Sequence, residues 1–239
     1  IIMRVDNRGR PLAGSEKTAA VDTICLGYGF WPSDQGPRLL NCEQRLDESL
    51  NTRVTLRDAW MQTSVPGAFV AGDAAGVGGK EIAVLEGRLA ALGAAQRAGV
   101  LNPTQAEARA RPLRARLKRE RRFAAFLNAY FGPLPGLWEL ISDDTVLCRC
   151  ENVTLGQVKR ALADGAETLA DVKAQTRLGM GRCAGRACNG LAAQVIAIVT
   201  GRPLEWASRC SVRPPIFPVS LGELESLGAA STTPGLHFD

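Results

Sequence analysis

The sequences VLCRCENVT, residues 146–154, and MGRCAGRACNG, residues 180–190, decide the fold of the C-terminal half of this chain. Together they place four cysteines in the pattern C-x-C, 32 residues, C-x4-C: Cys148, Cys150, Cys183 and Cys188. Close cysteine pairs at two distant places build four-thiolate cages, because each pair clamps one edge of a metal centre and the fold brings the pairs together. The spacing therefore predicts a metal centre.

Helix signals surround the cysteines. Thr154 with Gln157 and Thr168 with Asp171 each form a capping-box pattern, which predicts two helix starts. A third helix is expected to begin near Cys188 and to end at Gly201 and Pro203. Its buried face would comprise Leu191, Val195, Ile196 and Val199. The cysteines would then lie on loops at helix ends, within a small all-α domain.

Four thiolates can hold zinc or a 2Fe-2S cluster, since both need a rigid cage of soft ligands. The glycine-rich loop at residues 179–186 favours the cluster, because glycines free backbone N–H groups to bond its sulfides. Arg149, Arg182 and Arg186 would offset the negative charge of four thiolates. Zinc, or a structural site with no metal, stays an alternative on these residues alone.

A second pattern lies in the N-terminal half, in TSVPGAFVAGDAAGVGG, residues 63–79. A strand at residues 68–71 would stop at Gly72 and Asp73, pass a glycine loop that includes Gly78 and Gly79, and enter a helix over residues 81–96. Glycines allow close approach, a helix N-terminus favours phosphate, and an aspartate binds sugar or polyol hydroxyls. This pattern suits an anionic cofactor; the alternative is an ordinary strand-to-helix turn with an N-capping aspartate.

Further strands are expected at residues 2–5 and 20–30. The chain opens with Ile1 and Ile2 directly in a strand-like stretch, so a fragment or a truncated gene product is expected. Glu86, on the helix after the glycine loop, is expected to serve packing. No residue is assigned as catalytic, and His237, the single histidine, lies in a polar tail that is expected to be mobile.

Composition limits the class of protein. The chain has 239 residues, 46% of them hydrophobic, and seven cysteines, with no apolar run long enough for a membrane span and no signal-peptide pattern. These features predict a cytoplasmic protein with reduced thiols. Cys25, Cys42 and Cys210 are then expected to be buried small hydrophobic residues.

The net charge of +5 comes largely from a basic run over residues 109–122. Aromatic residues are not interleaved with this run, and no nucleic-acid-binding module surrounds it. It is therefore interpreted as a solvated helix face or a docking surface for an acidic partner subunit, and nucleic-acid binding is not expected.

Residues 63–79 resemble the C-terminal flavin motif of the two-dinucleotide-binding flavoprotein oxidoreductases. The resemblance implies that Asp73 holds a ribityl hydroxyl of FAD and that the helix beginning near Gly79 points its N-terminus at the flavin. Residues 27–33 look like the segment in which such chains return from the NAD-type domain to the FAD domain. The N-terminal G-x-G-x-x-G is absent. The FAD site is therefore expected to be only partly present.

The segments CRCENVTLGQV and TRLGMGRCAGRAC resemble the bacterioferritin-associated ferredoxin-like (BFD-like) 2Fe-2S domain, in the C-x4-C form fused to flavoprotein alpha subunits. With the flavin motif, they resemble the alpha subunits of hydrogen cyanide synthase, opine oxidases and hydroxyproline or proline dehydrogenases. The resemblance implies a hetero-oligomer with a second flavoprotein, the beta subunit, which oxidises a C–N bond of an amino acid or opine. FAD and the 2Fe-2S cluster would carry the electrons away.

The expected fold class is thus an α/β partial FAD-binding domain followed by a small all-α BFD-like 2Fe-2S domain. Residues 1–100 would form the flavoprotein part, 101–142 a basic helical linker, 143–213 the 2Fe-2S domain and 214–239 an extended tail. A non-enzymatic 2Fe-2S or zinc module with a relic flavin segment is the alternative function. An inactive fragment is a third reading.

Overall fold

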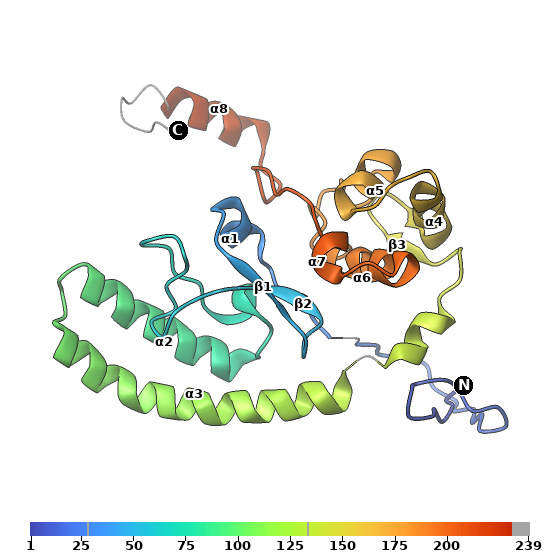
Figure 1. Cartoon of the computed structure of the whole chain (residues 1–239), viewed down its shortest axis with the longest axis horizontal. Helices are drawn as coiled ribbons and strands as arrows, with labels where there is room; N and C mark the ends of the chain where they lie inside the picture. The colour runs from blue at the N-terminus through green and yellow to red at the C-terminus, as the bar shows by residue number, and fades with distance from the viewer. Residues whose placement is uncertain (28, 133, 231–239) are drawn as a thin grey trace.

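The computed structural model describes residues 1–27, 29–132 and 134–230, and this part of the chain is largely helical (Figure 1). Its strands form two antiparallel sheets of two strands each. One sheet lies with the long helices in a first lobe, residues 31–131, and the other lies with shorter helices in a second lobe, residues 141–210. None of the helices in the described part combines the length and apolar character that a membrane span requires.

A β-hairpin organises the start of the first lobe. It follows the short helix α1 (Gln35–Leu39) and consists of β1 (Gln44–Asp47) and β2 (Thr52–Thr55), which pair with Gln44 opposite Thr55. The carboxylate of Asp47 accepts a hydrogen bond from the Ser49 backbone N–H at 3.1 Å, which closes the turn. Strand β2 then contacts the 3-10 helix η1 (Gly72–Ala75).

The long helices α2 (Lys80–Arg97) and α3 (Pro103–Phe131) pack against each other along much of their length. Helix α3 begins at a capping box of Asn102 and Gln105 with Pro103 in its first turn, a sequence that fixes the start of a helix. Buried apolar side chains hold the pair together: Met61, Ile82, Leu85, Leu89, Ala110 and Leu117. The basic run therefore lies on a helix that packs on α2.

After the 3-10 helix η2 (Pro135–Leu140), the second lobe begins with β3 (Val146–Cys148) and β4 (Val153–Thr154). Its helices are α4 (Leu155–Ala163), α5 (Leu169–Thr176), α6 (Asn189–Thr200) and α7 (Leu204–Ala207). Both predicted capping boxes, at α4 and α5, are confirmed, and so is the helix after Cys188. Of its predicted buried face, Val195 and Ile196 are buried, whereas Val199 is exposed. The hydrophobic core of this lobe contains fully buried side chains: Val158, Val172, Leu178, Ala192, Ile196 and Ala207.

The strand predictions for the N-terminal half are wrong for the described residues. Residues 2–5 and 68–71 form only isolated bridges: Ile2 with Lys17, Val5 with Pro11 and Phe69 with Gln62. No strand forms within residues 20–27 and 29–30. Ile24 and Leu26 are 71% and 75% exposed. A buried strand needs neighbouring strands to satisfy its backbone, and the described part supplies none for these segments.

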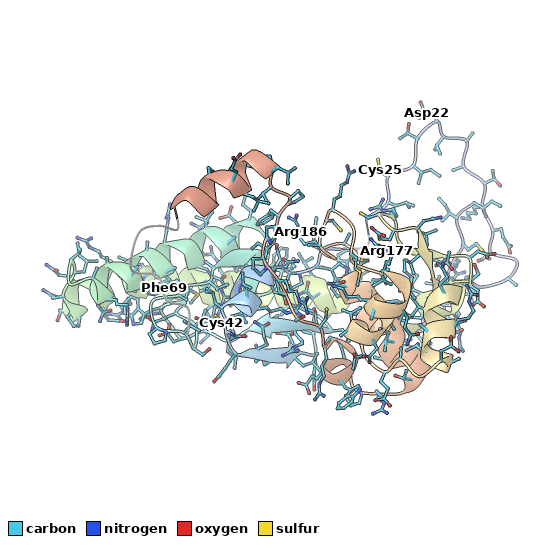
Figure 2. All side chains as sticks on the ribbon, turned by 90° about the horizontal axis from the view of Figure 1, so that it is seen from above. Asp22, Cys25, Cys42, Phe69, Arg177 and Arg186 are labelled. Carbon is cyan, nitrogen blue, oxygen red and sulfur yellow. The ribbon has the colours of Figure 1, made fainter. Side chains whose placement is uncertain are left out.

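Two further expectations are corrected. The segment after residue 214 is not extended throughout, because it contains the helix α8 (Leu221–Ala230). Cys25 is exposed and Cys210 half-buried, so only Cys42 is the buried residue that was expected. Figure 2 shows Cys42 near the hairpin and Cys25 on the outlying N-terminal segment, not far from Asp22. The predicted mobile tail around residues 231–234 and His237 lie outside the described residues.

Candidate metal centre

Two short structures bring the four cysteines to one end of the second lobe. Cys148 ends strand β3, and Cys150 lies in the turn that leads to β4. Cys183 lies in the glycine-rich loop after α5, and Cys188 is the N-cap residue of α6. The N-terminal end of a helix carries partial positive charge, so α6 favours negative charge at this place.

The thiols meet as pairs that join the two motifs. Cys150 Sγ lies 3.9 Å from Cys183 Sγ. Cys148 and Cys188 are both buried, and burial together with the neighbouring Cys148 thiol raises the pKa of Cys188 to about 12. Each of these two contacts joins one cysteine of each motif, and Cys183 and Cys150 also lie near enough to help raise the pKa of Cys188. The turn between β3 and β4 brings both cysteines of C-x-C to the thiols of the second motif.

This arrangement can be tested against the candidate metals. Two ligands 2.3 Å from one tetrahedral metal lie about 3.8 Å apart, which matches the Cys150–Cys183 separation. Within the described part of the chain, no three His, Cys, Asp or Glu side chains gather tightly enough to hold a single metal ion. The contacts between the motifs agree with a two-iron centre, in which each iron takes two thiolates.

The loop around Cys183 turns backbone N–H groups toward the sulfur. Ala184 and Gly185 have φ of 50° and 77°, and such left-handed residues let successive N–H groups face one point. Burial on its own would raise the pKa of the Cys183 thiol, but hydrogen bonds from the N–H groups of Ala187 and Gly185 bring it below its ordinary value. The loop is therefore built to hold negative charge on sulfur.

Gly181 lets the two motifs approach each other. A Cβ atom on Gly181 would collide with Cys150 Cβ, so any side chain there would push the C-x-C turn away from the loop. At the other side of the loop, the Asn189 side chain occupies the space that Cβ atoms on Gly179 and Gly185 would need. The glycines of this loop thus serve close packing as well as exposed N–H groups.

Two arginines near the thiols, Arg186 and Arg177, make contacts that the sequence did not predict. The Arg186 guanidinium lies 4.4 Å from the centre of the Phe217 ring. Phe217, in the segment after residue 210, therefore lies against the loop that carries Cys183. Arg177 donates a hydrogen bond to the Glu151 carboxylate at 2.9 Å and so ties the end of α5 to the C-x-C turn. Figure 2 labels Arg177 and Arg186 on this part of the second lobe. Sequence reasoning assigned no role to Phe217 or to Glu151, although Glu151 directly follows Cys150 in the C-x-C segment, because the sequence does not show which side chains they meet.

The second candidate site surrounds the glycine loop of the first lobe. Asp73 is exposed within η1, and its carboxylate accepts a hydrogen bond from the Gly78 N–H at 3.4 Å. Gly79, with φ of 84°, is the N-cap of α2, and no side chain caps that helix. Asp73 therefore does not cap α2, and the helix N-terminus stays open to an anion.

Glu86 holds the glycine loop in place through hydrogen bonds. Its side chain is 1% exposed, and its carboxylate accepts hydrogen bonds from the Gly72 N–H at 2.8 Å and from the Arg121 guanidinium at 2.9 Å. The first of these bonds holds the residue next to Asp73, and the second joins the loop to α3. Glu86 thus acts through hydrogen bonds, which goes beyond the packing role expected from the sequence.

A groove of about 830 Å³ opens beside the glycine loop. Its walls include Gly76 and Gly78 of the loop and basic residues of α3: Arg114, Lys118, Arg121 and Arg122. Such a groove can accept an anionic group close to the positive N-terminus of α2.

Comparison with known proteins bears on both sites. Residues 146–198, which include all four cysteines, match the family of BFD-like [2Fe-2S] binding domains. The chain is 35% identical over 226 residues to hydrogen cyanide synthase subunit HcnB of Pseudomonas aeruginosa, covering 93% of this chain and 47% of that protein. It is 34% identical over 218 residues to the A subunit of opine oxidase from Rhizobium meliloti, covering 89% of this chain and 45% of that protein.

These matches confirm the resemblance that the motifs indicated, over only part of the length of the relatives. The chain spans about half the length of the curated relatives it matches. Both relatives are named as subunits, one of hydrogen cyanide synthase and one of opine oxidase. No solved structure matches the chain.

Proposed function

We propose that this chain, whose residues 146–198 form a BFD-like [2Fe-2S] binding domain, is an electron-transfer subunit of an FAD-dependent oxidoreductase. The observation that carries the proposal is the pairing of thiols across the two motifs, with Cys150 Sγ 3.9 Å from Cys183 Sγ. Cys148, Cys150, Cys183 and Cys188 would hold the cluster, which supplies a site that takes up and gives back one electron.

Residues of the second lobe prepare the site for this charge. The N–H groups of Gly185 and Ala187 face the Cys183 sulfur, and α6 directs its N-terminus at Cys188. Hydrogen bonds to cluster sulfur raise the reduction potential, because they stabilise the more negative reduced state. The loop is thus suited to a centre that changes charge during turnover.

For the first lobe we propose that Gly72, Asp73, Gly78 and Gly79 form part of an FAD site. Asp73 is exposed and available to a hydroxyl, and the uncapped start of α2 favours phosphate. The partial α/β FAD-binding domain expected from the sequence is proposed on these grounds, together with the similarity to HcnB and to the opine oxidase relative.

The partner and the substrate are proposed from the family resemblance of the motifs, and the relatives' names support the proposal. We propose that the partner is a second flavoprotein and that an amino acid or opine C–N bond is the site of oxidation, with this chain receiving the electrons. All seven cysteines, each in the described part of the chain, are free thiols, which suits the reducing cytoplasm.

Anaerobic reconstitution of the chain with iron, sulfide and FAD tests the proposal. The expected result is a visible absorbance from both cofactors, two irons per chain, and an EPR signal after reduction. Cys150→Ser should abolish the cluster signal, whereas the matched change Cys25→Ser, at an exposed cysteine outside the site, should leave it unchanged. Zinc in place of iron would overturn the electron-transfer role.

The alternative, a 2Fe-2S module with a relic flavin segment, predicts cluster absorbance with no FAD retained. The open start of α2 and the hydrogen bond from Gly72 to Glu86 favour a working flavin loop over a relic. Measurement of FAD binding to Asp73→Ala, beside the wild type, separates the two functions.

A further inference from the structure

Trp31, just before α1, lies directly against helix α6 of the second lobe. A Cβ atom on Gly190 would lie 2.5 Å from Trp31 Cε3 and 2.7 Å from its Cδ2, so the indole occupies the space that any side chain at Gly190 would need. Gly190 follows Cys188 by two residues. The first lobe therefore touches the second immediately beside the thiol loop.

Two hydrogen bonds reinforce this contact. The side-chain amide of Gln194, which is 4% exposed, donates to the Asn51 carbonyl oxygen at 2.8 Å. The Arg38 guanidinium donates to the carbonyl oxygen of Cys210. A buried amide needs a partner, so Gln194 loses a bond if the lobes separate. These contacts join residues more than 140 positions apart in the sequence.

Asn51 lies in the turn of the β1–β2 hairpin, and this hairpin also contacts the glycine loop of the first lobe. A Cβ on Gly76 would lie 3.2 Å from Val54 Cγ1 and 3.5 Å from Leu50 Cδ1. Leu50 therefore borders the glycine loop, and its neighbour Asn51 binds α6. The turn of the β1–β2 hairpin thus bridges the two candidate cofactor sites, and Figure 1 shows the hairpin between the α2–α3 pair and the second lobe.

A small cavity of about 70 Å³ lies in the contact between the lobes. Charged side chains line it from both lobes, among them Asp34, Arg38, Arg53 and Arg186. Burial raises the pKa of Asp34, and the positive charges of Arg38 and Arg53 oppose that rise. The lobes therefore meet through the Trp31 contact and a few hydrogen bonds, and single substitutions can loosen them.

We infer that the β1–β2 hairpin and Trp31 form a docking surface that holds the second lobe in a fixed position against the glycine loop, so that electrons pass between the two sites. The inference rests on the proposed function. With both cofactors bound, the glycine loop would hold the flavin as the electron donor and the four cysteines would hold the cluster as a one-electron acceptor. The role of Trp31, Asn51 and Gln194 is positioning.

Hydrogen exchange on the cluster-loaded chain tests the docking. Gly190→Leu inserts a side chain into the place of Trp31, and Gln194→Leu removes the bond to Asn51. In both variants residues 48–54 should exchange at least about tenfold faster, with cluster absorbance retained. Gln175→Leu, on the exposed side of α5, is the matched control and should change nothing. Unchanged exchange at residues 48–54 in both variants would overturn the docking.

A second measurement tests the functional part. In the FAD-loaded chain, the cluster should bleach about tenfold or more slowly in both variants after the flavin is reduced by light, because electron transfer depends on close positioning. Faster exchange with an unchanged bleaching rate would refute the role in electron transfer. A wild-type chain that binds no FAD would count against the proposed function, whereas the exchange result would still decide the docking.

Discussion

Glu86 and Arg57 form a two-point ion pair inside the first lobe, with both guanidinium-to-carboxylate distances at 2.7 Å. Arg57 also donates to the Val70 carbonyl oxygen at 3.0 Å, directly before the glycine loop. The pair therefore fixes both the chain that enters the loop and, through Glu86, the Gly72 N–H. A bidentate pair of this kind is strong and directional because two parallel bonds fix both groups.

Removal of this carboxylate should destabilise the first lobe. Glu86→Ala leaves Arg57 without its partner in a largely buried place, and breaking such a pair costs about 3–5 kcal/mol. Urea unfolding of the full chain measures the change. Glu81→Ala is the matched control, because its pair with Arg116 is half-exposed and worth less than about 1 kcal/mol. Equal effects of the two substitutions would contradict a structural role for Glu86.

Gly181 should be essential for the cluster although it binds nothing. Gly181→Ala adds a Cβ that collides with Cys150 Cβ, so the C-x-C turn must move away from Cys183. We expect loss of most of the iron and of the visible absorbance after reconstitution. Gly87→Ala, at a helical position with open space around it, should retain full iron content. An intact cluster in Gly181→Ala would show that the turn tolerates the displacement.

The local features of this molecule could be predicted from the sequence and the long-range features could not. The capping boxes at Thr154 and Thr168 depend on residues three positions apart, so the pattern contains the whole interaction. A strand such as residues 20–30 depends on neighbours that the pattern does not contain. The thiol partners of Cys148 and Cys150 likewise depend on how the β3–β4 turn directs each side chain.

Long-range contacts also involve residues near the thiols that no local pattern indicates. Phe217 reaches Arg186 from a segment with no helix or strand signal. Asn189 is placed by the start of α6, and only the folded loop shows that it occupies the space beside Gly179 and Gly185. Conversely, the four cysteines were predicted as a set because their chemistry restricts what such a spacing can do.

Asp171 should make the stability of the second lobe depend on pH. Hydrogen bonds from the Thr168 hydroxyl and from the backbone N–H groups of Glu167 and Thr168 lower the pKa of its carboxyl. A lowered pKa in the folded state means that the carboxylate stabilises the fold above its unfolded pKa, and that this contribution disappears as the pH falls through the folded pKa.

Asp171→Ala is therefore expected to lower the free energy of unfolding by about 1 kcal/mol at neutral pH, the usual effect of losing a cap. The difference from wild type should shrink below the ordinary aspartate range. Urea unfolding at several pH values measures both. Asp164→Ala, at the other end of the preceding helix, is the control. A difference that persists in strong acid would mean that Asp171 acts through packing.

Phe217 should protect the thiol loop from loss of iron. Its ring faces the Arg186 guanidinium at 4.4 Å, and such a contact is worth about 0.5–1 kcal/mol at a partly exposed site. Phe217→Ala should free Arg186 and the loop that carries Cys183, so that a chelator removes iron about two- to fivefold faster, which corresponds to that energy. Phe126→Ala, an exposed aromatic residue of α3, is the matched control and should leave the rate unchanged. The rate at which the visible band bleaches in excess chelator measures the effect. Equal rates for both variants would show that the segment after residue 210 does not shield the loop that carries Cys183.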